Sequence, residues 1–135
     1  MASVDKPVAN ILLAEDNEDD AIILSRALRK ANVNHALIRV IDGEEAITYL
    51  MDKPRPDLVL LDLKMPRMDG FDVLAFIRTR PELKGLPVVI LTGSELANDK
   101  KMAEQLGVED YLVKDFDWHA IAEALKHSIA KALGS

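Results

Sequence analysis

The sequence contains no cysteine, no excess of basic residues and no long apolar run. Without cysteine the chain has no disulfides, no thiolate metal ligands and no cysteine nucleophile. Its 17 lysine and arginine residues are outnumbered by 23 aspartate and glutamate residues, and the formal net charge of −6 argues against a nucleic-acid-binding surface. No apolar run approaches the roughly 20 residues of a membrane span, and residues 1–8 lack the apolar core of a secretory signal. We therefore expect a cytoplasmic protein that binds neither nucleic acid nor membranes.

The length of the chain favours a single domain. A chain of 135 residues can bury about two-thirds of its unfolded surface in one core, and a second core of useful size does not fit beside it. We therefore expect residues 1–135 to form one domain.

The stretch from Asp57 to Gly70 contains the predicted central strand, around which the other strands and helices are arranged. Residues 58–61 read Leu-Val-Leu-Leu and follow Pro56, a pattern typical of a strand that is buried on both faces. Asp62 comes directly after this run. Open α/β sheets bind ligands at the carboxyl ends of their strands, because the loops diverge there and leave a crevice. The pattern therefore predicts that Asp62 lies at the ligand-binding edge of a sheet.

Apolar runs alternate with helical patterns along the whole chain. The predicted strands are 11–14, 36–41, 58–61, 87–92 and 111–113; the predicted helices are 21–31, 43–51, 71–78, 97–106 and a last one capped by Asp117. Parallel strands joined by right-handed helical crossovers leave helices on both faces of the sheet. The pattern predicts an α/β fold, a doubly wound sheet of five parallel strands.

Three of the predicted helices carry more specific expectations. Asp19 or Asp20 is expected to cap the helix at 21–31. The helix at 97–106 has few large apolar residues and should be the least firmly docked, with Gly107 as its left-handed stop. The last helix has apolar residues at helical spacing, which indicate core packing or, as the alternative, a homodimer or partner face: Trp118, Ile121, Leu125 and Ile129.

Polar side chains follow four of the predicted strands: Glu15 and Asp16, Asp62, Thr92, and Lys114. Because parallel strands end at the same edge of a sheet, these groups should meet in one crevice. Carboxylates that cluster without histidine or cysteine suit Mg²⁺ or Mn²⁺ better than zinc. A metal, a hydroxyl and a lysine together suit a phosphoryl group, which a carboxylate could accept as an acyl phosphate.

At these positions the chain resembles the response-regulator receiver domains of two-component signalling, over roughly residues 9–132. The resemblance implies a flavodoxin-like receiver fold with strand order 2-1-3-4-5. It implies that Asp62 accepts a phosphoryl group from the phosphohistidine of a sensor histidine kinase or of a histidine phosphotransfer protein. It also implies that Mg²⁺, or Mn²⁺, is held by Glu15, Asp16, Asp62 and the backbone carbonyl of Lys64.

The same resemblance assigns roles to the other strand ends. Thr92 and Lys114 would bind the phosphoryl group, and Gly93 would leave room for it. Phosphorylation adds about two negative charges and three acceptor oxygens. Movement of Thr92 toward these oxygens would vacate space for the ring of Tyr111 and repack the surface of the helix at 97–106. The chain is thus expected to be a phosphoacceptor switch that shows slow autodephosphorylation, and not an enzyme acting on other substrates.

One residue departs from the family pattern. Receiver domains usually have a cis proline after the phosphate-binding lysine, whereas Asp115 follows Lys114 here. A cis bond without proline costs about 3 to 4 kcal/mol, so we expect a trans bond. We also expect the Asp115 carboxylate to draw Lys114 away from the phosphoryl group. This departure keeps open the alternative that the chain is a phosphate-independent protein-binding module with a receiver fold.

Comparison with two other classes of protein, a phosphatase family and the small regulators, argues further for a signalling function. Phosphatases of the haloacid-dehalogenase kind carry a second aspartate two residues after the nucleophile, and Lys64 stands at that position here. We expect no DNA-binding domain, and in this respect the chain resembles the small single-domain regulators. Some of those regulators partner phytochrome-type histidine kinases of bacteria.

Overall fold

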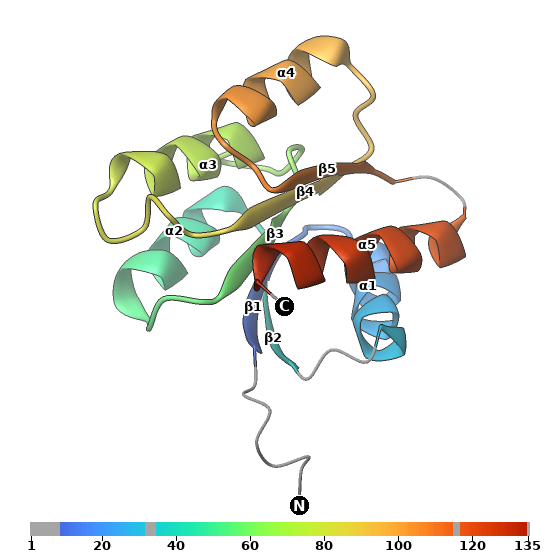
Figure 1. Cartoon of the computed structure of the whole chain (residues 1–135). Coiled ribbons are helices and arrows are strands. Elements are labelled where there is room, and N and C mark those ends of the chain that lie inside the picture. Colours follow the sequence, from blue (N-terminus) through green and yellow to red (C-terminus); the bar gives the residue numbers. More distant parts are fainter. Residues whose placement is uncertain (1–8, 32–34, 115–116, 135) are drawn as a thin grey trace, which may run out of the picture.

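The computed structural model describes residues 9–31, 35–114 and 117–134. Strands and helices alternate along the chain and form a central sheet covered by helices on both faces (Figure 1). The strands are β1 (Ala9–Ala14), β2 (His35–Val40), β3 (Leu58–Leu61), β4 (Val88–Thr92) and β5 (Asp110–Val113). The helices are α1 (Glu18–Lys30), α2 (Gly43–Asp52), α3 (Gly70–Thr79), α4 (Ala97–Gln105) and α5 (Trp118–Ala132).

The sheet has five strands in the order β2-β1-β3-β4-β5, and every neighbouring pair is parallel. This topology confirms the predicted doubly wound fold. β1 is two residues longer at its start than the sequence pattern indicated, because Ala9 pairs with His35 and extends the ladder between β1 and β2. No helix among the described residues is long and apolar enough to cross a membrane.

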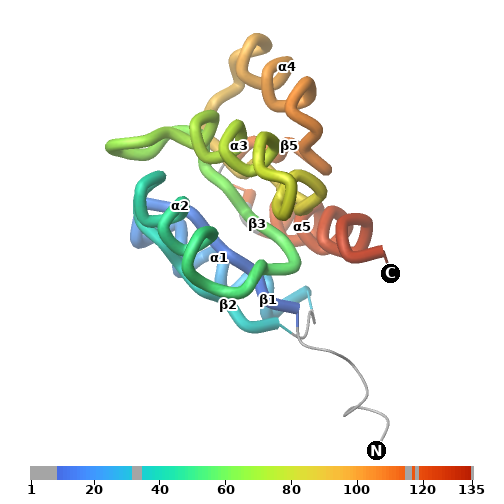
Figure 2. Tube along the Cα trace, turned by 90° about the vertical axis from the view of Figure 1, so that its left-hand side faces the viewer, coloured from blue at the N-terminus to red at the C-terminus, as the bar shows by residue number. Residues whose placement is uncertain are grey.

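β3 is the central strand, and its burial explains its uniform apolar sequence. It pairs with β1 on one side and with β4 on the other, and all of its residues are buried. Val59 and Leu61 pack in the core under α2, α3 and α4, whereas Leu58 and Leu60 pack in the core under α1 and α5. Figure 2 shows α2 and α3 on the side of β3 nearer the viewer, with α1 and α5 behind it. Burying each such side chain stabilises the fold by about 1.5 to 3 kcal/mol.

The start of α1 differs from the prediction. Asn17, and neither Asp19 nor Asp20, caps the helix: its side chain accepts a hydrogen bond of 2.9 Å from the backbone N–H of Asp20. Asn17 has the extended backbone of a cap, and the helix begins at Glu18, three residues earlier than expected. Asp19 and Asp20 lie in the first turn, where the helix dipole favours negative charge. Their carboxylates are therefore not used for capping.

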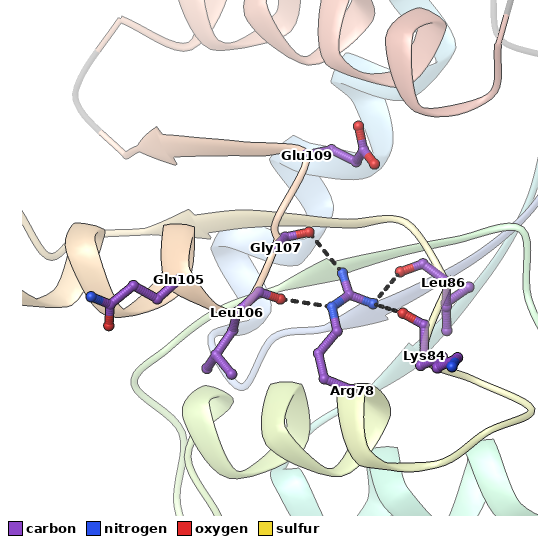
Figure 3. A pocket seen from close by; sticks show the side chains of 8 residues that line it. Arg78, Lys84, Leu86, Gln105, Leu106, Gly107 and Glu109 are labelled. Carbon is purple, nitrogen blue, oxygen red and sulfur yellow. Dashed lines mark hydrogen bonds between the residues drawn. The ribbon is translucent and has the colours of Figure 1, made fainter.

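The C-terminal end of α4 is held by Arg78 of α3 (Figure 3). The guanidinium donates hydrogen bonds to the carbonyl oxygens of Leu106 (2.7 Å), Gly107 (3.0 Å), Lys84 (2.9 Å) and Leu86 (2.8 Å). Gly107 has a positive φ of 74°, as its predicted role as a helix stop requires. These bonds join α3, the connector before β4 and the loop after α4.

The N-terminal end of α4 is held much more lightly. Leu96 precedes the helix, supplies no side-chain cap and is 62% exposed. Ala103 is the one residue of α4 that is buried. The expectation of a lightly docked helix thus agrees with the structure, because few apolar contacts hold α4 against the sheet.

The last helix packs as predicted over most of its length. Asp117 caps α5 by accepting a hydrogen bond from the N–H of Ala120, and the side chains of Ile121, Leu125 and Ile129 are buried against α1 and the sheet. The side chain of Trp118 lies outside the described residues, and the homodimer face stays a prediction. The predicted trans bond after Lys114 and the effect of Asp115 also fall outside the described part of the chain.

Candidate functional site

Asp62 lies directly after β3, at the carboxyl-terminal edge of the sheet. Its side chain is 7% exposed, and its backbone N–H donates to the carbonyl of Ala14 at the end of β1. One carboxylate oxygen, Oδ1, lies 3.2 Å from the backbone nitrogen of Lys64, and the other, Oδ2, lies 3.0 Å from Lys114 Nζ. Both oxygens of the Asp62 carboxylate thus face hydrogen-bond donors.

The start of α3 packs against the backbone of Asp62. A Cβ atom at Gly70 would lie 2.3 Å from the carbonyl oxygen of Asp62 and 2.7 Å from Cα of Leu63. No side chain fits in that space, so glycine is required for this close approach. The helix consequently fixes the position of the Asp62 backbone.

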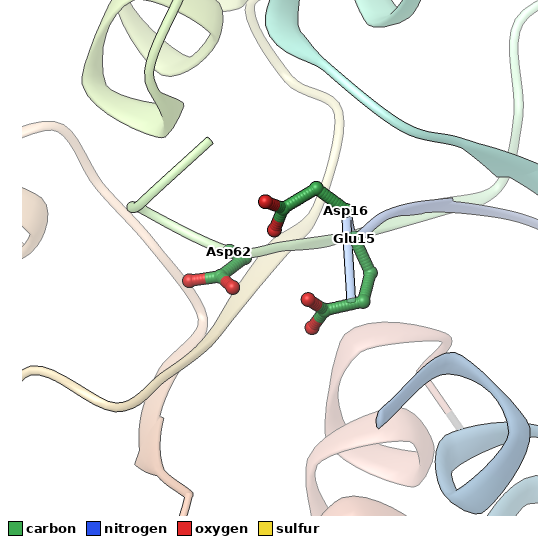
Figure 4. A group of neighbouring side chains, drawn as sticks. All are labelled: Glu15, Asp16 and Asp62. Carbon is green, nitrogen blue, oxygen red and sulfur yellow. The ribbon is translucent and has the colours of Figure 1, made fainter. Parts of the chain in front are cut away.

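Glu15, Asp16 and Asp62 form one carboxylate cluster (Figure 4). Each offers an oxygen, and these oxygens all lie within 4.8 Å of one another. The register of the sheet explains this proximity, since Ala14 pairs with Leu61 and the next residues on both strands are acidic. Glu15 is buried and Asp16 is exposed. The site is thus open on one side.

The donor set of this cluster fits a hard divalent cation. Glu15 Oε1 is buried, and its close charged contact is Lys114 Nζ at 2.6 Å. Lys114 also contacts Asp20 and Asp62, so one ammonium faces three carboxylates and the cluster keeps negative charge that a bound cation would offset. Oxygen ligands from several carboxylates are those that Mg²⁺ and Mn²⁺ prefer.

Lys114 extends into the cluster from the end of β5. Its Nζ lies 2.6 Å from Glu15 Oε1, 2.9 Å from Asp20 Oδ2 and 3.0 Å from Asp62 Oδ2. The backbone N–H of Lys114 donates to the carbonyl of Thr92, which ties the end of β5 to the end of β4. The lysine therefore contacts Asp62, and its side chain is mostly buried.

The electrostatics of the cluster follow from one ammonium facing several carboxylates. Burial raises the pKa of Glu15 to about 7, and the charge of Asp62 adds to this effect, while Lys114 and the N–H of Asn17 oppose it. Burial lowers the pKa of Lys114, but the contacts with Glu15, Asp20 and Asp62 outweigh burial and raise it above its ordinary value. Glu15 holds its proton more tightly mainly because it is buried, and Lys114 does so because carboxylates surround it.

Thr92 and Tyr111 are joined through Ser94, in the loop between β4 and α4. Thr92 ends β4 and is fully buried, and its hydroxyl oxygen lies 3.4 Å from the backbone nitrogen of Ser94. The hydroxyl of Tyr111 donates to the carbonyl of Ser94 at 3.0 Å. A Cβ atom added at Gly93 would meet nothing within 4 Å, so the loop leaves open space there.

Two residues that the sequence analysis did not assign to the site support the cluster. Asp20 contacts Lys114, as described above. Arg39 of β2 donates through Nε to the carbonyl of Glu15 at 2.9 Å and thereby holds the turn after β1. For Lys64, the described contacts are its N–H toward Asp62 and an exposed ammonium 3.9 Å from Asp99; a metal contact by its carbonyl stays a prediction.

Residues 11–126 match the sequence model of the response regulator receiver domain. The chain belongs to this family. The receiver is 38% identical over 120 residues to the response regulator Rcp1 of Synechocystis sp., a match that covers 84% of this chain and 82% of Rcp1. The resemblance inferred from the strand ends is thereby confirmed, and the chain is a receiver of two-component signalling.

Solved structures of receivers agree with this assignment. The phosphorylated cyanobacterial phytochrome response regulator RcpA has a TM-score of 0.85 and 36% identity, covering 96% of each chain. The Mn²⁺-bound form of Rcp1 has a TM-score of 0.83 and 34% identity, covering 93% of this chain and 94% of Rcp1. The receiver of the Pseudomonas aeruginosa sensor histidine kinase PA1611, with magnesium in its active-site cleft, has a TM-score of 0.80 and 28% identity, covering 96% of this chain and 100% of the PA1611 receiver.

Proposed function

We propose that Asp62 accepts a phosphoryl group from the phosphohistidine of a sensor histidine kinase or of a histidine phosphotransfer protein, in a reaction that depends on Mg²⁺. The observation that carries this proposal is the contact of Lys114 with Asp62 inside a carboxylate cluster, in a chain of the receiver family. The similarity to RcpA, which was crystallised phosphorylated, supports it further.

The proposed reaction takes place at the carboxylate of Asp62, among the side chains that surround it. A carboxylate oxygen of Asp62 attacks phosphorus, the bond from phosphorus to the histidine nitrogen breaks, and an acyl phosphate forms. Glu15, Asp16, Asp62 and the carbonyl of Lys64 would hold the divalent cation, which supplies positive charge to the phosphoryl oxygens. Lys114, which contacts Asp62, would neutralise further charge, and the hydroxyl of Thr92 would donate to a phosphoryl oxygen.

The output of the reaction is a change at α4 and β5. Thr92 and Tyr111 both contact Ser94, so a movement of Thr92 toward the phosphoryl group alters the loop that holds the Tyr111 hydroxyl. The few apolar contacts of α4 allow such a change to repack its surface. A protein partner would then recognise the altered surface.

The protein is modified once per cycle and turns over no separate substrate, which makes it a signalling module and not an enzyme. Lys64 stands where haloacid-dehalogenase phosphatases have their second aspartate. We propose a cytoplasmic regulator, and a phytochrome-type kinase as the phosphodonor because RcpA is a phytochrome response regulator. The net charge of −6 favours protein partners over nucleic acid.

The test is phosphorylation by a small-molecule phosphodonor with Mg²⁺, followed by intact-mass spectrometry. We expect the mass of one phosphoryl group on the wild type, no addition on Asp62→Asn, and none when the cation is removed with a chelator. If the wild type is not modified, and a partner binds it and Asp62→Asn equally well, the chain is a phosphate-independent binding module instead.

A further inference from the structure

Asp20 is the third carboxylate on Lys114, and the proposed reaction gives it no task. Its Oδ2 accepts a hydrogen bond of 2.9 Å from Nζ, as close as the one accepted by Asp62. Unlike Glu15 and Asp62, it is not part of the cluster that could hold a cation. Its side chain is 26% exposed, so it approaches Lys114 from the rim of the site.

The local structure of α1 leaves the Asp20 carboxylate available for this contact. Asn17 caps the helix through the N–H of Asp20, so the side chain of Asp20 has no capping role. The contact spans 94 residues in sequence and joins α1 to the end of β5. Lys114 has three N–H donors, and three carboxylates lie within hydrogen-bonding distance of Nζ: those of Glu15, Asp20 and Asp62.

A bound cation changes the balance among the three partners of Lys114. Glu15 and Asp62 would share their charge with the cation, whereas Asp20 would keep its full attraction for the ammonium. A phosphoryl group on Asp62 brings new anionic oxygens that need Lys114. These oxygens must compete with Asp20 for the ammonium, and the charge of Asp20 also repels them.

We propose that Asp20 restrains Lys114 and thereby weakens the binding of the phosphoryl group at Asp62. Asp20 is a positioning residue that acts through Lys114 and touches no reacting atom. The inference rests on the proposed function. The separate restraint expected of Asp115 falls outside the described residues and stays a prediction.

The experiment measures two affinities in the whole chain. Mg²⁺ binding is followed by calorimetry, and binding of beryllofluoride, a phosphoryl mimic, is followed by ¹⁹F NMR at saturating Mg²⁺. We expect Asp20→Asn to bind beryllofluoride about tenfold more tightly, because a charge-assisted hydrogen bond that competes for Lys114 is weakened. We expect its Mg²⁺ affinity to fall by roughly two- to fivefold, because one nearby negative charge is gone.

The opposite signs of the two changes separate restraint from structural damage, since a disturbed site would lose affinity for both ligands. Asp20→Ala should change both affinities in the same directions as Asp20→Asn. Asp19→Asn is the matched control: it removes the same charge from the same turn, at an exposed residue that forms no ion pair with Lys114 among the described residues. We expect it to leave beryllofluoride affinity within about twofold of the wild type.

Two results would overturn the inference while leaving the proposed function intact. One is a wild type that binds beryllofluoride with Asp20→Asn binding equally or less tightly; the other is an equal gain in Asp19→Asn. A wild type that binds Mg²⁺ but no beryllofluoride would instead refute the proposed function, and the inference with it.

Discussion

The two edges of the sheet differ in how their charged groups are paired. At the carboxyl-terminal edge, the ammonium of Lys114 faces three carboxylates, those of Glu15, Asp20 and Asp62. At the amino-terminal edge, the guanidinium of Arg78 donates to four carbonyl oxygens. The carboxyl-terminal edge therefore has net negative charge that can bind a cation, whereas the guanidinium at the amino-terminal edge is paired with carbonyl groups.

Smaller contacts at the amino-terminal edge follow the same rule. Asp57, just before β3, accepts a hydrogen bond of 2.8 Å from the N–H of Asn10. Asp110, at the start of β5, accepts one of 2.6 Å from the hydroxyl of Ser128. Paired buried groups stabilise a fold, while unpaired ones make it responsive to ligands. Substitutions at the two edges should therefore separate stability from phosphoacceptance.

The largest effect is expected at Gly70, where packing supports the carboxyl-terminal edge directly. In Gly70→Ala the new methyl group would lie 2.3 Å from the carbonyl oxygen of Asp62, and α3 or the Asp62 loop must move. We expect a loss of about 3 kcal/mol in the free energy of unfolding, measured with urea, together with strongly reduced phosphorylation. Gly93→Ala is the control for stability, because its methyl group meets nothing within 4 Å; equal losses in the free energy of unfolding in both variants would contradict the packing argument.

Arg78→Met tests the amino-terminal edge. It removes four hydrogen bonds and leaves partly buried carbonyl oxygens without donors. We expect the free energy of unfolding to fall by about 2 to 3 kcal/mol. Phosphorylation of Asp62 in the folded protein should persist, because Arg78 lies at the far edge of the sheet.

Arg80→Met is the matched control for Arg78→Met. Arg80 is more exposed, forms a surface ion pair with Glu82 and lies 5.1 Å from the ring centre of Phe76. Contacts of this kind contribute less than about 1 kcal/mol each. A loss of phosphorylation in Arg78→Met, measured under conditions where the variant is folded, would show that the two edges are not independent.

The sequence predicts the strands well and the long-range polar contacts poorly. β3 was predictable because burial on both faces demands an uninterrupted apolar run, and parallel topology then brings Glu15, Asp62, Thr92 and Lys114 to one edge. The cap of α1 was not predictable, because Asn17, Asp19 and Asp20 are all good capping residues. Only the backbone conformation selects among them.

Asp20 and Arg78 show where local patterns carry no information. The partner of Asp20 is 94 residues away, and its position on the first turn of α1 is explained equally well by the helix dipole. Arg78 binds backbone carbonyls, which every residue has, so no side-chain pattern marks its partners. Both contacts depend on the packed arrangement of helices that the sequence pattern alone leaves open.

The smallest expected effect is the competition between a proton and Mg²⁺ for Glu15, at the carboxyl-terminal edge. Glu15 has a pKa of about 7 in the cation-free protein, against 4.5 ordinarily. The folded state therefore binds more protons than the unfolded state between these values, and the contribution of Glu15 to stability falls as the pH rises from about 4.5 to 7. A cation needs the deprotonated carboxylate, so Mg²⁺ and a proton compete for the site.

We expect the Mg²⁺ affinity to fall about tenfold between pH 8 and pH 6, as measured by calorimetry, because one proton must then be displaced on binding. Glu15→Gln should bind Mg²⁺ more weakly at pH 8, since it lacks the charge, and its remaining affinity should change little over the same interval. The cation-free variant should also lose less stability than the wild type as the pH rises from 5 to 8. A wild-type affinity that is constant from pH 8 to pH 6 would mean that Lys114 keeps Glu15 ionised, and that the excess negative charge lies on the other carboxylates.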